Sequence, residues 1–110
     1  MYKLLNLTGH DITIKNRLMP EPVIIPSSGR LRARYTTIDR GFLQTEVGNI
    51  HLTQNHYYKM RNMPDPKPGV FLIVSRLVAE LYPERDDLLI TNGLIKEDGK
   101  TIACRSLAKL

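Results

Sequence analysis

The chain has 110 residues, a length typical of one domain, and 42% of them are apolar and 25% charged. These values are typical of a folded soluble protein, exclude a disordered chain, and lead us to expect a single domain over residues 1–110. No apolar run approaches the roughly 20 residues that span a bilayer, so no membrane partner is expected. The single cysteine, Cys104, excludes an internal disulfide and fits a reducing cytoplasm, while the net charge of +5 suits an anionic partner.

The first half of the chain is predicted to consist of short strands joined by polar turns. Leu4–Ile14 reads as a strand, a turn and a second strand, and Val23–Ile25 is a third strand that Pro26 ends. From residue 30 basic and apolar residues alternate, which predicts a strand with Arg30, Arg32 and Arg34 on one face. Phe42–Leu52 is expected to form a hairpin around a Gly48-Asn49 turn.

The second half is organised around Gly69–Ile90, the longest apolar stretch. It predicts a strand at Val70–Val74, an N-cap at Ser75, a short helix near residues 75–82 with Leu77, Val78 and Leu81 inward, and a strand at Leu88–Ile90. Pro83 should end the helix.

The segments on either side of this unit complete the prediction. Thr53–Gly69, with three prolines, should be a connector without regular structure, and Leu94–Leu107 a hairpin turning at Asp98-Gly99. The predicted fold class is therefore α+β: mostly antiparallel or mixed sheet, about seven short strands, and one short helix near residues 75–82.

A candidate anion site lies where the Val70–Val74 strand meets the helix. Free backbone amides at a helix start attract anions, and Ser75 and Arg76 add a hydroxyl and a guanidinium. Asn6, Thr8 and His10 would lie at the same sheet edge if the first strand runs parallel to Val70–Val74. Without a ligand, Ser75 and Arg76 would be the cap of a helix and a solvated arginine. Asn6 and Thr8 would then form hydrogen bonds within their own turn.

The remaining polar residues suggest two alternative functions. Arg30, Arg32 and Arg34 could bind nucleic acid phosphates, or could protect an edge strand against aggregation. A small hydrolase using His10 would need a carboxylate partner, and Asp11 should point away from the histidine. The three histidines show no metal-binding spacing, so no metal site, cofactor or catalytic residue is predicted, and Arg85 is expected to pair within its acidic turn.

Five stretches of the chain carry a resemblance. They are Asn6–Ile12, Ile25–Gly29, Ile73–Ala79, Arg85–Leu89 and Gly99–Arg105, and contain N-L-T-x-H, I-P-x-S-G, V-S-x-L-V-A and R-D-D-L-L. With them the chain resembles a group of small, functionally uncharacterised proteins of phages, prophages and bacteria. The resemblance implies a phage or mobile-element origin, location in the cytoplasm of a bacterial host cell, and no catalytic residues. Gly9 stands where the group is expected to have proline, a change that should only loosen the turn.

The resemblance also suggests that the polar turns converge on one pocket. The expected ligand-binding residues are Asn6, Thr8, His10, Ser27, Ser75, Arg76 and Arg105. The leading hypothesis is a non-enzymatic phage accessory protein that binds a small anionic, nucleotide-like ligand or a host protein, with counter-defence as one role that such binding could serve. Nucleic-acid binding and a small hydrolase are the alternatives, and the chain is compatible with a monomer or a homodimer.

Overall fold

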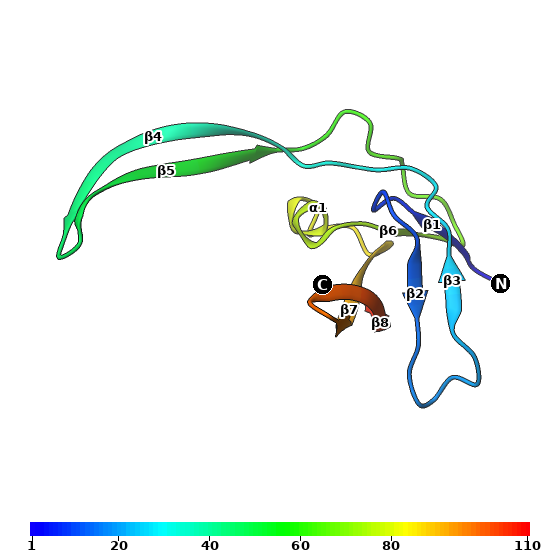
Figure 1. Cartoon of the computed structure of the whole chain (residues 1–110). Helices are drawn as coiled ribbons and strands as arrows, with labels where there is room; N and C mark the ends of the chain where they lie inside the picture. The colour runs from blue at the N-terminus through cyan, green and yellow to red at the C-terminus, as the bar shows by residue number, and fades with distance from the viewer.

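The computed structural model describes residues 1–110 and shows a mostly β protein with one short helix (Figure 1). Its elements are β1 (Lys3–Asn6), β2 (Ile12–Ile14), β3 (Val23–Ile25), β4 (Arg34–Thr45), β5 (Gly48–Tyr58), β6 (Val70–Ile73), α1 (Arg76–Leu81), β7 (Leu88–Glu97) and β8 (Lys100–Ala108). The α+β class is confirmed, with eight strands in a single small domain. No helix is long and apolar enough to cross a membrane.

Six of the strands form one mixed sheet in the order β1-β6-β7-β8-β2-β3. Strand β1 runs parallel to β6, which meets the condition set for the Asn6, Thr8 and His10 site. As predicted, β7 and β8 form an antiparallel hairpin that turns at Asp98-Gly99. The two outer strands approach each other, because Asn6 and Ser27 form a parallel bridge in which the Ser28 amide donates to the Asn6 carbonyl at 2.7 Å. The sheet therefore curls back on itself, and we call it, together with α1, the body.

Apolar side chains cover both faces of this sheet. Since successive residues of a strand point to opposite faces, Leu72 and Ile73 of β6 belong to different cores. The larger core lies under α1, and the smaller one is formed by the fully or nearly buried side chains of Ile12, Ile14, Ile25, Ile73 and Cys104. The body thus has a complete hydrophobic interior.

Helix α1 begins and ends where the sequence predicts. The Ser75 hydroxyl oxygen accepts the Val78 amide at 3.3 Å, and the helix stops at Leu81, two residues before Pro83. Its inward face was predicted less well: Val78 is buried, but Leu77 is 36% exposed. Ala79 and Tyr82 lie inward instead, since the Tyr82 hydroxyl reaches the Met60 backbone amide at 2.8 Å.

Arg85 links the proline-rich connector to the body by a hydrogen bond. Arg85 donates from Nε and Nη2 to the two carboxylate oxygens of Asp87, each at 2.7 Å, and from Nη1 to the Pro64 carbonyl at 3.0 Å. The two charged side chains are only 12% exposed, and the hydrogen bonds from Arg85 hold the pKa of Asp87 below its usual value. The predicted local pairing of Arg85 is confirmed.

Strands β4 and β5 form a separate hairpin, which we call the arm (residues 34–58). The sequence-based prediction was wrong here in two respects. The chain turns at Glu46-Val47 rather than at Gly48-Asn49, and Thr53–Tyr58, predicted to lack regular structure, is strand. Pairing with β4 explains the second error, because each residue from Thr53 to Tyr58 lies opposite a β4 residue.

The arm gives the molecule an elongated shape. The Cα radius of gyration is 17.7 Å, against about 13 Å for a compact domain of this length. Figure 1 shows the arm curving away from the body. The register of its two strands shifts between Asp39 and Phe42, beside Gly41 with a φ of 80°. Apart from its root, the arm is not covered by any other element.

Candidate functional site

Asn6 is the most buried of the predicted site residues, with none of its side chain exposed. Its Nδ2 donates to the carbonyls of His10 (2.8 Å) and Ile25 (3.0 Å), and its Oδ1 accepts the Thr8 amide (3.1 Å) and hydroxyl (2.6 Å). These four bonds use the hydrogen-bonding capacity of the amide group. Asn6 therefore joins three segments of the body and has no polar atom left for a ligand.

The neighbouring polar residues, His10 and Ser27, lie close to Asn6. The ring Nδ1 of His10 is 3.2 Å from the carbonyl oxygen of Asp11, so this nitrogen donates a hydrogen bond to the backbone. The Asp11 carboxylate accepts the Ser27 amide at 2.9 Å instead of facing the imidazole. The arrangement lacks the His–carboxylate pair that the hydrolase alternative requires.

A cavity of about 230 Å³ lies where the arm leaves the body, and we call it the root cavity. Its lining residues come from the polar turn, the segment before β4, the start of β4 at the root, and the start of α1: Thr8, Arg30, Leu31, Arg32, Ala33, Tyr35, Ser75 and Leu77. The root cavity therefore brings together two of the predicted ligand-binding residues, Thr8 and Ser75. It adds two arginines that the sequence assigned to the nucleic-acid alternative.

The segment before β4 directs these arginines outward. Leu31 is buried against the larger core, and its amide donates to the Leu7 carbonyl at 3.0 Å. Ala33 packs against the same core, so Arg30, Arg32 and Arg34 all lie on the exposed side, as the alternation predicted. However, β4 begins only at Arg34, so Arg30 and Arg32 lie in the connector before this strand and not on the edge of a strand.

Gly9 leaves room for the side chain of Arg30, a contact that the sequence did not predict. Its φ is 90°, a value that proline cannot adopt. A Cβ added at Gly9 would lie 2.7 Å from Cδ of Arg30. The absence of a side chain therefore lets the arginine stem pack directly over the turn.

The root cavity offers cationic donors that are not already engaged. Neither Arg30 nor Arg32 takes part in any of the four ion pairs of the structure. The Ser75 hydroxyl oxygen accepts an amide, which leaves its proton to donate, whereas the Thr8 proton is shared between Asn6 and the His10 carbonyl. Two guanidiniums and one hydroxyl can together bind an oxyanion.

Five of the seven predicted residues do not line the root cavity, and two of them, Arg76 and Arg105, lie on other parts of the surface. Arg76 pairs with Glu80 across one helical turn, with Nε and Oε1 3.1 Å apart. Arg105 lines a separate surface hollow with Asn16 and Arg17, and its carbonyl accepts the Asn16 side chain at 2.7 Å. The seven predicted residues are therefore not brought together in one pocket.

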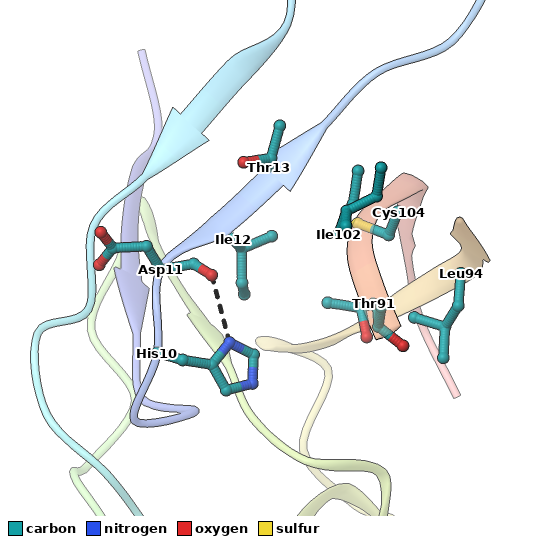
Figure 2. Close-up of a pocket in the computed structure, with 10 residues that line it drawn as sticks. His10, Asp11, Ile12, Thr13, Thr91, Leu94, Ile102 and Cys104 are labelled. Atoms are coloured by element: carbon teal, nitrogen blue, oxygen red, sulfur yellow. Dashed lines mark hydrogen bonds between the residues drawn. The ribbon is translucent and has the colours of Figure 1, made fainter. Parts of the chain in front are cut away.

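A smaller cavity, of about 90 Å³, opens between β2 and the β7–β8 hairpin (Figure 2). His10 and Ile12 lie at one side of it, and Thr91, Leu94 and Cys104 lie at the other. Cys104 is 2% exposed, as expected of a structural thiol, and burial raises its pKa. A thiol that is harder to ionise is a poor nucleophile, so this cavity shows no activated cysteine.

The sequence did not predict that Arg30 and Arg32 line the same cavity as Ser75, and the reason is spatial. Their outward direction could be read from the alternation with Leu31 and Ala33. Their proximity to Ser75 depends on the contact between Leu31 and the turn after β1, which no local pattern reveals.

Neither a metal site nor a known relative indicates the function of this protein. No group of three or more His, Cys, Asp or Glu side chains is placed to hold a metal ion. No protein-family model, curated protein or solved structure matches the chain. A function must therefore be argued from the root cavity and the surface.

Proposed function

We propose that the protein is a non-enzymatic binding protein that takes a small anionic ligand, such as a phosphorylated or nucleotide-like molecule, in the root cavity. The observation that carries this proposal is the convergence of Arg30, Arg32 and Ser75 on one cavity beside the ring of Tyr35. Guanidiniums bind phosphate oxygens in a bidentate way, and an aromatic ring can stack on a base. At about 230 Å³ the cavity is just below the usual range for small-molecule sites, which favours a small ligand.

The phage resemblance suggests what such binding would achieve. A small phage protein that binds a nucleotide could sequester a signalling molecule of the host, which is a counter-defence role without catalysis. Blocking a host protein is the other form of the same role. Both remain proposals that rest on the resemblance and on the root cavity.

Thermal unfolding in the presence of a panel of inorganic phosphate, mononucleotides and cyclic nucleotides tests ligand binding. A ligand that binds only the folded state raises the melting temperature, by an amount that grows with its concentration. We expect a rise for at least one member of the panel in the wild type. Arg32→Gln should abolish that rise.

Arg105→Gln is the matched control, since it removes the same charge at a site outside the root cavity. It should leave the ligand-induced rise intact. No rise with any member at saturating concentration would count against the proposal, and so would an equal loss in the two variants.

Nucleic-acid binding remains a second candidate because Arg30, Arg32 and Arg34 form an exposed row free of ion pairs. Arg34 separates the two functions, since it belongs to the row but does not line the root cavity. If the row binds phosphates of DNA or RNA, affinity should fall steeply with salt, and Arg34→Gln should weaken it. Binding of a small ligand should be unaffected by that substitution.

A further inference from the structure

The arm carries an aliphatic patch that no other element covers. Cross-strand pairing places Leu43 opposite Ile50 and Ile38 opposite Gln54, and alternation puts Ile50, Leu52 and Gln54 on one face of β5. The register shift between Asp39 and Phe42 brings Ile38 and Leu43 to that same face. The four aliphatic side chains, which we call the aliphatic patch, are 39% to 52% exposed. The opposite face carries no aliphatic pair: its pairs are polar, such as Gln44–Asn49 and Thr37–Asn55, or contain aromatic rings, as in Phe42–His51 and Tyr35–Tyr57.

The edges of the arm have few of the features that keep edge strands from pairing. Residues 34–58 contain no lysine and no proline, and a single irregularity interrupts the register between Asp39 and Phe42. A two-stranded hairpin without support is at best marginally stable in water. An arm of this length with one aliphatic face is therefore expected to be covered by other protein surface.

The charges of the arm indicate what covers it. Arg34 and Arg40 are balanced by Asp39 and Glu46, so the arm is formally neutral although the whole chain carries +5. This balance gives the arm no attraction for a polyanion. Asp39 and Arg40 lie next to each other in the middle of β4, whereas Arg34 is at the root and the acidic Glu46 is exposed at the tip.

A second copy of the chain fits this distribution. If two arms lie antiparallel, the Glu46 tip of each reaches the basic root of the other, near Arg34 and Arg61, and the two aliphatic patches face each other. This arrangement has two-fold symmetry, in which one surface complements itself. It covers the patches while the two positively charged bodies stay apart.

We propose that two copies of the chain associate through their arms, patch against patch and antiparallel, to form a two-fold dimer. Eleven strand residues span about 37 Å at ~3.4 Å each. With a width on the order of 10 Å, each arm would bury on the order of 400 Å². The total is below the ~1,200 Å² of standard stable interfaces, so the dimer should be weak and reversible.

Sedimentation of the full chain over a wide concentration range tests this dimer. The wild type should shift from one chain to two as its concentration rises. Leu43→Glu should remain monomeric, since it places two buried carboxylates in the facing patches. Gln44→Glu is the matched control: it adds the same charge one residue away on the opposite face, and should dimerise like the wild type.

Glu46→Lys tests the antiparallel orientation. It should weaken the dimer several-fold at low salt by placing a cation at the partner's basic root, and added salt should reduce the difference. A wild type that stays monomeric at every concentration would overturn the proposal and assign the patch to another protein. Equal dissociation by Leu43→Glu and Gln44→Glu, or an assembly larger than a dimer, would overturn it as well.

Discussion

The molecule contains two hairpins of similar length that differ in their surroundings. The β7–β8 hairpin (residues 88–108) contributes Leu88, Ile90, Ala103 and Cys104 to the cores of the body. The arm is as long and as regularly paired, yet none of its side chains is buried. Strand pairing alone therefore does not make a stable unit. The faces of the β7–β8 hairpin are covered by the cores of the body, whereas the faces of the arm are exposed. We conclude that the body stabilises the fold, and that the arm is available for interaction.

The largest expected effect lies at Asn6, in the body. Asn6→Ala would leave the carbonyls of His10 and Ile25 without their buried donor, so we expect the free energy of unfolding to fall by roughly 3–5 kcal/mol. Urea unfolding followed by circular dichroism measures this. Asn55→Ala in the arm is the control, because it removes an exposed bond to Thr37, and it should cost less than about 0.5 kcal/mol. Equal costs at the two positions would contradict the comparison.

The same substitution can be made in the two hairpins. Ile90 is 8% exposed and Ile50 is 43% exposed. Ile90→Ala should cost about 3 kcal/mol, because it leaves a cavity in the larger core, whereas Ile50→Ala should cost less than about 1 kcal/mol in dilute, monomeric protein. Urea unfolding of both variants measures the ratio. A cost at Ile50 that matched the cost at Ile90 would show that the arm contributes to the folded core.

The Arg85–Asp87 pair should have a smaller effect. Asp87→Ala should cost roughly 2 kcal/mol, somewhat below the ~3–5 kcal/mol of fully buried pairs, because the side chains are 12% exposed. Glu80→Ala, which breaks the exposed pair with Arg76, should cost about 0.5 kcal/mol or less.

This pair should also make stability depend on pH. The pKa of Asp87 is lowered in the folded protein, so its contribution is present above the unfolded pKa of about 3.9 and is lost as pH falls through the folded pKa. The wild type should therefore lose more stability than Asp87→Ala between pH 5 and the acid limit of folding. Parallel pH profiles of the unfolding free energy for the two proteins would contradict this assignment.

The smallest effect is expected from removing most of the arm. Replacing residues 36–56 by Asn-Gly keeps the Tyr35–Tyr57 pair and supplies a two-residue hairpin turn. We expect the free energy of unfolding of the body to change by less than about 1 kcal/mol, since the deleted side chains cover no buried residue. Thermal and urea unfolding measure this, and failure of the shortened chain to fold would show that the body depends on the arm.

Elements that depend on local chemistry could be predicted from the sequence, whereas elements that depend on pairing with a distant segment could not. The Asp98-Gly99 turn, the Ser75 cap and the stop before Pro83 depend on local chemistry, and all three were predicted correctly. Thr53–Tyr58 was not, because its polar residues become a strand only by pairing with β4.

The site was predicted only in part for the same reason. Thr8 and Ser75 were expected to meet and do share the root cavity, but Arg105 does not join them. The Asn6 amide group is not free to bind a ligand, because it donates to the carbonyls of His10 and Ile25. That seemingly local turn residue is thus fixed by a segment 19 residues away.

Hydrogen exchange of individual backbone amides, measured at low and at high protein concentration, tests most directly whether the arm depends on a partner while the body does not. Amides of β6, β7 and β8 should be strongly protected to the same extent at both concentrations. Amides of β4 and β5 should exchange rapidly in dilute protein and gain protection as the concentration rises. Strong protection of the arm in dilute protein, equal to that of the body, would contradict the account.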